Sequence, residues 1–212
     1  MRPKATRGAC SFCGKDYTKA GMAKHLAKCL SDQGQSAKGR KSSPCFHLQV
    51  SGKSISAYWL HLQVDANTTL KMLDNFLRDI WLECCGHMSL FFIGRGEIDM
   101  SRRLSSFPAQ GMIIDYDYDM GSTTSLEIKV MAAYQGLVAP RKPVEILARN
   151  EPPAIPCDAC GQDQAVLICP ECQWEGEGWL CKACAAKHEC GDEEFLVPVA
   201  NSPRAGVCGY MG

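Results

Sequence analysis

Apolar and polar residues alternate in two stretches around residue 55, and this pattern predicts a β-hairpin. The apolar members are Phe46, Leu48 and Val50 in the first stretch and Tyr58, Leu60, Leu62 and Val64 in the second. Alternation with a period of two gives each strand one apolar face to pack on a core. The intervening residues 51–53, Ser-Gly-Lys, have the composition of a turn. The two stretches are therefore expected to pair.

Over residues 67–85 the apolar period changes to that of a helix. Apolar residues three or four positions apart form one stripe: Leu70, Leu73, Leu77, Ile80, Trp81 and Cys84. Such a stripe predicts an amphipathic helix that packs on the sheet. Asn67 or Thr68 is the expected N-cap. Asp74 and Arg78, four residues apart, are expected to pair on the outer face.

Three further stretches complete the central region. Residues 89–93 are a short apolar run, expected as a buried strand. Residues 112–120 and 125–134 alternate on either side of Gly121, which predicts a second antiparallel pair. A helix packed on two hairpins and a strand makes the central domain, residues 44–138, an α+β fold with an antiparallel sheet.

Two stretches poor in large apolar side chains divide the chain. Residues 31–43 include nothing apolar larger than alanine and are expected to be a flexible linker. Residues 139–156 contain five prolines and are expected to be a stiffer linker, with a short helical turn over 144–149. The chain therefore divides into an N-terminal segment (1–30), the central domain and a C-terminal segment (157–212).

Fourteen of the 212 residues are cysteine, and most of these lie in the two end segments. The sequence shows no apolar run long enough for a signal peptide or a membrane-spanning helix, which favours a cytoplasmic protein. Thiols stay reduced in that compartment, so closely spaced cysteine pairs are better explained as metal ligands than as disulfides.

The N-terminal segment has the spacing of a four-ligand zinc site, formed by Cys10, Cys13, His25 and Cys29. A helix beginning near residue 18 would place His25 and Cys29 one turn apart on one face, where both can reach the same tetrahedral ion. The motif resembles the Cys-Cys-His-Cys variant of the ββα zinc finger, with one residue fewer between its ligand pairs than the common form.

The C-terminal segment contains eight further ligands, enough for two tetrahedral ions. A crossed arrangement would give one ion Cys157, Cys160, Cys181 and Cys184 and the other Cys169, Cys172, His188 and Cys190. Crossing of this kind resembles the B-box and ZZ-type zinc modules. Sequential pairing stays open because Cys184 and His188 lie four residues apart, and Cys208 is an alternative ligand to Cys190. Twelve ligands for about three zinc ions leave no position for water, so structural rather than catalytic sites are expected.

The net charge is zero overall but differs strongly between segments. Residues 1–43 carry ten Lys/Arg and two acids (+8), residues 44–150 ten and eleven (−1), and residues 151–212 three and ten (−7). The basic end suits DNA or RNA, with Lys15, Lys19, Lys24 and Lys28 as the expected nucleic-acid contacts. A solvated basic face or a contact with a protein explains the same charges. The acidic end favours a protein partner, and an exposed Trp174 or Trp179 would be an anchor for a peptide.

Two motifs in the central domain carry a resemblance to a known family. They are TTLKMLDNFLRDIWLECCGHMSLFFI, residues 68–93, and YDYDMGSTTSLEIKV, residues 116–130. With the order hairpin, helix, strand, hairpin, residues 45–135 resemble the plasmid pRiA-type open-reading-frame-three-like family, whose members are known as transposon passenger proteins. The resemblance implies an α+β fold and a transposon-associated protein, and it assigns no activity.

An enzymatic alternative rests on the acidic residues of the central domain. Asp115, Asp117 and Asp119 would share one strand face, and Glu97, Asp99 and Glu127 extend the set. Such carboxylates suit a divalent cation in a nuclease or transferase, although a solvated strand face has the same spacing.

Other candidate chemistry in the central domain is sparse. Cys84 continues the apolar stripe of the helix, and Cys85 and His87 would bind metal only if another segment supplied partners. No pairing of a nucleophile with a base stands out. The sequence therefore predicts a zinc-stabilised, non-enzymatic adaptor for nucleic-acid or protein partners, without catalytic residues.

Overall fold

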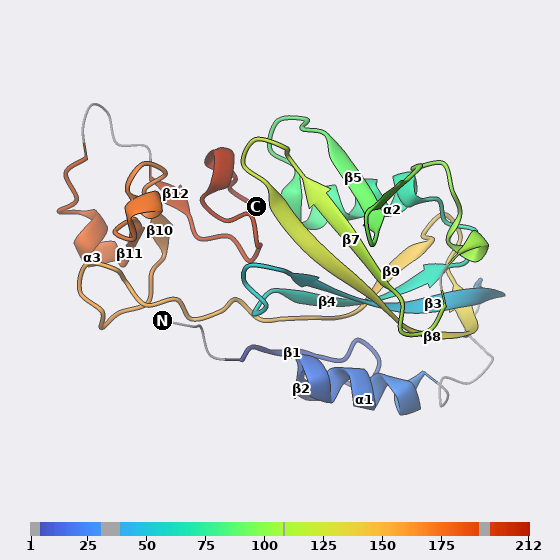
Figure 1. The fold of residues 1–212 in the computed structure, drawn as a ribbon. Helices are drawn as coiled ribbons and strands as arrows, with labels where there is room; N and C mark the ends of the chain where they lie inside the picture. The colour runs from blue at the N-terminus through green and yellow to red at the C-terminus, as the bar shows by residue number, and fades with distance from the viewer. Residues whose placement is uncertain (1–4, 31–38, 108, 191–195) are drawn as a thin grey trace.

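The computed structural model describes residues 5–30, 39–107, 109–190 and 196–212 and confirms the α+β class (Figure 1). Its centre is a seven-stranded antiparallel sheet in the order β6-β5-β7-β8-β3-β4-β9. The strands are β3 (Lys41–Gly52), β4 (Trp59–Asp65), β5 (Ser89–Ile93), β6 (Gly96–Ile98), β7 (Ile113–Tyr118), β8 (Thr124–Val138) and β9 (Val144–Arg149). Among the described residues, no helix is long and apolar enough to cross a membrane.

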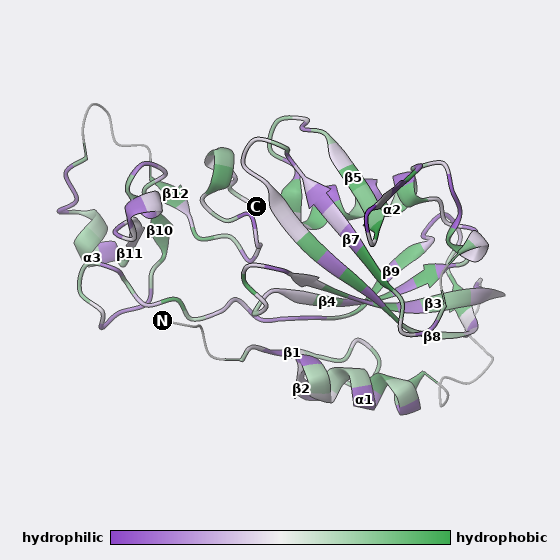
Figure 2. Cartoon of the chain, viewed as in Figure 1, coloured by the Kyte–Doolittle hydropathy of each residue, from purple (hydrophilic) through white to green (hydrophobic). Residues whose placement is uncertain are grey.

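Both hairpins expected from the alternating pattern are confirmed. In the first, Phe46 lies opposite Val64 and Val50 opposite Leu60. In the second, β7 pairs with β8, and Ile114 lies opposite Ile128. Hydrophobic and hydrophilic residues alternate along β7 and β8 (Figure 2). One face of the sheet therefore supplies the main core, which α2 (Leu70–Leu77) covers.

The central helix differs from its prediction at both ends. Its N-cap is Thr69, whose Oγ1 accepts a hydrogen bond from the amide of Met72 at 3.3 Å, rather than Asn67 or Thr68. The carbonyls of Met100 and Arg102 accept from the next two amides, at Lys71 and Leu70, and so fix where the helix begins. At the other end α2 gives way to a π-helical turn, η1 (Arg78–Leu82).

The expected linkers are shorter than predicted, because the sheet recruits residues from both. Residues 41–43 belong to β3, where Lys41 lies opposite Val138, while residues 31–38 of the first linker lie outside the described residues. Val144–Arg149 forms strand β9 on the edge of the sheet instead of a helical turn. Pairing with β4 supplies the backbone hydrogen bonds that local sequence could not predict.

The N-terminal segment packs on the face of the sheet opposite α2. Its hairpin, β1 (Arg7–Ala9) and β2 (Asp16–Thr18), leads into α1 (Lys19–Cys29), and this unit lies beneath the sheet in Figure 1. One apolar cluster joins the two parts: Cys10, Met22, Leu26, Trp59, Leu147 and Ala148. The amide of Ser11 also donates to the carbonyl of Leu147 at 2.8 Å. Both faces of β4 are therefore buried.

A buried pair of histidines lies in this contact. His47 Nε2 is 2.8 Å from His61 Nδ1, and His61 Nε2 is 3.3 Å from the carbonyl oxygen of Lys19. A carbonyl only accepts, so His61 donates from Nε2 and accepts at Nδ1 from His47. Burial lowers the pKa of His47 to about 4 and that of His61 to about 3. Both rings are therefore neutral at pH 7 and join α1 to the sheet.

Gly8 offers a way to loosen this contact without changing any of the predicted zinc ligands. A Cβ at Gly8 would overlap the carbonyl oxygen of Arg149 and lie 2.8 Å from the Trp59 ring. We expect Gly8→Ala to cost about 1–3 kcal/mol through overpacking and to speed hydrogen exchange in α1 and β9 by about tenfold. Ala9→Ser, at the exposed neighbouring position, is the control. Unchanged exchange in Gly8→Ala would contradict the packing described above.

The C-terminal segment contains a small sheet and a tail that returns to the central domain. The sheet has β10 (Leu167–Ile168) between β11 (Trp179–Leu180) and β12 (Val197–Pro198), beside η3 (Cys172–Glu175) and α3 (Lys182–Ala185). Residues 199–212 then lead through η4 (Val207–Gly209) between this sheet and the central one (Figure 1). Ser202 Oγ donates to the carbonyl of Trp81 at 2.5 Å, so the tail packs on the central domain.

Candidate metal centres

The structure brings together the four predicted ligands of the N-terminal segment. The ligand atoms of Cys10, Cys13, His25 and Cys29 lie within 4.8 Å of one another. The Cys10 and Cys29 sulfurs are 3.9 Å apart, and the Cys13 sulfur is 3.3 Å from His25 Nε2. Bond lengths of a tetrahedral zinc site imply about 3.8 Å between two sulfurs and about 3.5 Å between sulfur and nitrogen. The cluster therefore has the dimensions of a zinc site.

Local structure explains why these four side chains converge. Gly14 adopts a positive φ of 70°, and its amide donates to the carbonyl of Cys10 at 2.8 Å, which closes the turn that carries the first two cysteines. Helix α1 places His25 and Cys29 one turn apart. Tyr17 stacks on the His25 ring at 4.5 Å and fixes its orientation.

In the C-terminal segment the ligands converge in the crossed arrangement. One group joins Cys157, Cys160, Cys181 and Cys184, and the other joins Cys169, Cys172, His188 and Cys190. The distance between the sulfurs is 4.0 Å for Cys160 and Cys181 and 3.3 Å for Cys172 and Cys190. Helix α3 ends at Ala185, so Cys184 and His188 are not held on one helical face. They belong to different groups.

Backbone amides favour the thiolate form of the first cysteine in two turns of the C-terminal segment, Cys157 and Cys169. Burial raises the pKa of Cys157, but hydrogen bonds from the backbone of Cys181, Cys160 and Ala159 outweigh it and lower the pKa to about 6. The same balance lowers the pKa of Cys169 to about 7. Thiolates are the form that binds zinc. In the same two groups the pKa is raised to about 12 for Cys172, by its hydrogen bond with Cys190, and for Cys184, by its hydrogen bond with Cys181.

The apolar core of this segment is small. It consists of two clusters of buried residues. The first contains Cys157, Leu180, Cys181 and Ala185, and the second contains Ile168, Val197 and Ala205. Trp179 packs against the second cluster, whereas Trp174 is 68% exposed. So little buried apolar surface does not fold a segment of this size, and bound metal would supply the difference.

A fourth group of convergent ligand atoms was missed by sequence reasoning. Cys84, Cys85, His87 and Cys208 lie with their ligand atoms within 4.8 Å of one another. The sequence offered Cys85 and His87 without partners and Cys208 as an alternative to Cys190. The tail instead brings Cys208 to the end of η1, while Cys190 stays beside Cys172. The signal available was the incomplete ligand set at Cys85 and His87, together with Cys208, which the three predicted sets did not need.

The four lysines predicted to contact nucleic acid do not share one face. Lys15, Lys24 and Lys28 are exposed, and the last two lie one turn apart on the outer side of α1. Lys19 lies on the inner side, half-buried against the sheet, where burial lowers its pKa. The structure therefore presents three of these lysines to solvent.

The acidic strand does not form the predicted set of three aspartates on one face. β7 ends at Tyr118, and Asp119 turns away with a positive φ of 65°. Its carboxylate receives a hydrogen bond from Arg204 at 2.7 Å, and this guanidinium holds the pKa of Asp119 at about 2. Asp115 pairs with Lys53 at 2.9 Å. Within the described residues, the groups of convergent ligand atoms contain no carboxylate.

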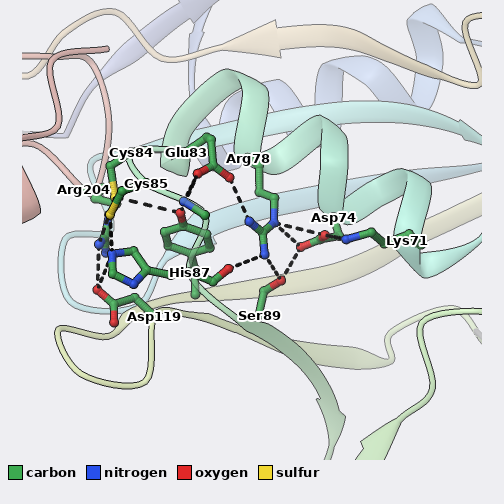
Figure 3. A network of polar contacts seen from close by, with 12 residues as sticks. Lys71, Asp74, Arg78, Glu83, Cys84, Cys85, His87, Ser89, Asp119 and Arg204 are labelled. Atoms are coloured by element: carbon green, nitrogen blue, oxygen red, sulfur yellow. Dashed lines mark hydrogen bonds and ion pairs between the residues drawn. The ribbon is translucent and has the colours of Figure 1, made fainter.

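A buried polar network joins the fourth group to α2 (Figure 3). Asp74, expected on the outer face, is fully buried, and its carboxylate accepts from Lys71, Arg78, Ser89 and Tyr116 at 2.6–3.1 Å. Burial raises the pKa of Asp74, but these donors outweigh it and keep the pKa below its usual value. Arg78 continues the network to Glu83 at 2.8 Å. The helix end that carries Cys84 is thereby fixed.

Comparison with known proteins adds little to this geometry. One similar solved structure is a protein of unknown function, MM3350, from Methanosarcina mazei Go1, with a TM-score of 0.44 and 16% identity over 57% of this chain and 76% of that chain. A likeness of this level carries no argument about function. No protein-family model and no curated protein matches the chain.

Proposed function

We propose that the protein is a zinc-stabilised adaptor that binds nucleic acid and protein partners through its metal-braced segments. The observation that supports it is the convergence of twelve predicted ligands into three complete sets of four within 4.8 Å. A site with four protein ligands leaves no position for substrate or water, so it stabilises structure and does not catalyse.

Nucleic-acid binding is supported by the outer surface of the N-terminal segment. Lys24 and Lys28 follow one side of α1, and Lys15 lies in the adjoining turn. Phe12, in the cysteine turn, is 37% exposed and offers a ring on which an unpaired base could stack. This unit packs on the sheet through Trp59. A bound nucleic acid would therefore be held by the whole central domain and not by a zinc finger on a flexible tether.

A cleft beside this unit extends the proposed surface. It has a volume of about 1020 Å³, and its lining includes Phe12, Leu30, Gln63, Tyr134, Arg141 and Lys142. Lys28 lies two residues before Leu30. Arg141 and Lys142 would add two phosphate-seeking charges to those of α1.

A protein partner is proposed for the C-terminal segment. Residues 151–212 carry three basic and ten acidic residues, a net −7 that repels nucleic acid. Trp174 projects from η3 into solvent, and an exposed tryptophan rimmed by acids suits a basic peptide. The proposed adaptor would thus bring a polyanion and a basic protein together. A cytoplasmic setting, expected from the absence of a long apolar run, belongs to this proposal, as does the transposon-associated role that the family resemblance implies.

Charge reversal at two exposed lysines tests the nucleic-acid half. The variant Lys24→Glu/Lys28→Glu should bind fluorescently labelled DNA or RNA at least about tenfold more weakly and reduce the slope of log affinity against log salt by about 2. Fluorescence anisotropy at several salt concentrations measures both quantities. Deleting residues 1–43 would be a poor test, since it exposes Trp59 and removes part of β3.

The matched control is Lys182→Glu/Lys187→Glu, which reverses two exposed lysines of the acidic segment. We expect this control to bind as the unmodified protein does. Absence of binding at low salt, or equal weakening by both pairs, would overturn the nucleic-acid half of the proposal.

A further inference from the structure

We propose that Cys84, Cys85, His87 and Cys208 bind a fourth zinc ion, which fastens the C-terminal tail to the central domain. The four ligands come from segments more than 120 residues apart in sequence, the end of η1 and the turn η4. Each of the other three ions would stabilise one small segment. This ion would instead join the central domain, which supplies Cys84, Cys85 and His87, to the tail, which supplies Cys208.

The distances between the ligand atoms fit a tetrahedral ion. The Cys85 sulfur is 3.6 Å from the sulfurs of both Cys84 and Cys208, and the Cys208 sulfur is 3.5 Å from His87 Nε2. Zinc bond lengths imply about 3.8 Å and about 3.5 Å for such pairs. The Cys85 sulfur is closer to His87 Nε2, at 2.9 Å, so binding a zinc ion would move these two ligand atoms apart by about 0.6 Å.

Backbone conformation provides an independent observation. Of three described residues other than glycine with positive φ, two lie here: Cys208 at 52° and Asp119 at 65°. Glycines flank Cys208 at positions 206 and 209, both also with positive φ. Left-handed backbone in residues with a Cβ persists where its surroundings require it, commonly at functional sites. Here it points the Cys208 sulfur at Cys85 and His87.

The residues around the ligands provide the support that a metal site needs. Arg204 is fully buried, donates to the Cys84 sulfur at 3.4 Å and to Asp119 at 2.7 Å, and stacks on the Tyr118 ring. A zinc ion with three thiolates carries one negative charge, and the guanidinium beside Cys84 offsets it. Hydrogen bonds from outside the ligand set orient ligands in the same way in known metal sites.

The ligand types favour zinc over other common ions. Three thiolates and an imidazole are soft or borderline donors, which select zinc rather than calcium or magnesium. The bound ion would fix the tail that returns from the C-terminal segment, and at the start of this tail Asn201 hydrogen bonds with Asn150 at 2.9 Å. The residues that lead into the C-terminal segment and the tail that leaves it would then both be held against the central domain.

Counting zinc in the intact, reduced protein tests this inference separately from the proposed function. Native mass spectrometry should find four ions in the unmodified chain and three in Cys208→Ser and in His87→Ala. Cys45→Ala is the matched control, because Cys45 alone among the fourteen cysteines lies outside all four groups, and it should retain four. Hydrogen exchange over residues 199–212 should be faster in Cys208→Ser, with residues 157–190 unchanged.

Three ions in the unmodified protein, or four in Cys208→Ser, would overturn the fourth site and leave the other three intact. Cys85→Ser, at an exposed position, gives the same readout if Cys208→Ser does not fold. A disulfide between Cys85 and Cys208 in protein purified with reductant would also overturn it. If instead the unmodified protein holds no zinc at the three groups predicted from the sequence, that result would contradict the proposed adaptor.

Discussion

A double variant that removes Cys157 and Cys181 should lose one zinc ion, whereas one that removes Cys157 and Cys169 should lose two. The reason is the crossed arrangement, in which Cys157 and Cys181 belong to one group of ligands and Cys169 to the other. Sequential pairing would reverse the result, because it gives Cys157 and Cys169 to one ion and Cys181 to the next. Substituting serine and counting ions by native mass spectrometry distinguishes the two.

Loss of either ion should also unfold part of the C-terminal segment. Structural zinc contributes on the order of 10 kcal/mol to the folding of small peptides, and the two apolar clusters here are too small to replace it. Hydrogen exchange over residues 157–190 should become fast in either double variant and on treatment with a zinc chelator. Exchange in β3 and β8 should stay slow, and Cys45→Ala should keep both ions. Slow exchange throughout 157–190 after zinc removal would contradict this account.

Asp74→Ala should lower the free energy of unfolding of the central domain by about 3–5 kcal/mol, the usual cost of removing one partner from a buried ion pair. Asp74 has no exposed side-chain surface, and its removal leaves the buried Tyr116 hydroxyl without its acceptor and takes from Arg78 one of its two carboxylate partners. Urea denaturation, followed by tryptophan fluorescence because Trp81 lies in the same core, measures the change.

Two controls separate charge from shape in this network. Lys71→Ala removes a donor that is 55% exposed and should cost at most about 1 kcal/mol. Asp74→Asn keeps the size of the side chain but loses the charge. Because the folded-state pKa of Asp74 lies below its unfolded value, the charge stabilises the fold above about pH 4. The difference in free energy of unfolding between Asp74→Asn and the unmodified protein should shrink as the pH falls below that value. A loss under 1 kcal/mol in Asp74→Ala would contradict the role given to Asp74.

Local sequence was sufficient for the elements whose pattern is strong. Alternation predicted both hairpins, β3 with β4 and β7 with β8, and the apolar stripe predicted α2. Ligand spacing predicted which residues gather at three of the four groups, because two cysteines in a tight turn have few ways to point their sulfurs. The α+β class followed from the order of these elements.

Other features depended on contacts between distant residues. β9 forms because β4 offers an open edge, and proline-rich sequence around it gave no local signal. Asp74 is buried because Arg78, Ser89 and Tyr116 converge on it, whereas helical spacing alone suggested an exposed pair. The basic N-terminal unit packs on the sheet because the second face of β4 offers it the buried ring of Trp59 and a hydrogen bond from His61.

The sequence by itself determined the local geometry of the protein: the periods of its strands and helix, the turns between cysteine pairs, and the charge of each end. Only the tertiary structure decided which of these units meet, including the return of Cys208 to Cys85 and His87. The physical reason is range. Hydrogen bonds within a turn or helix are set by neighbouring residues, whereas a ligand group built from both ends of a 120-residue interval depends on the packing of everything between them.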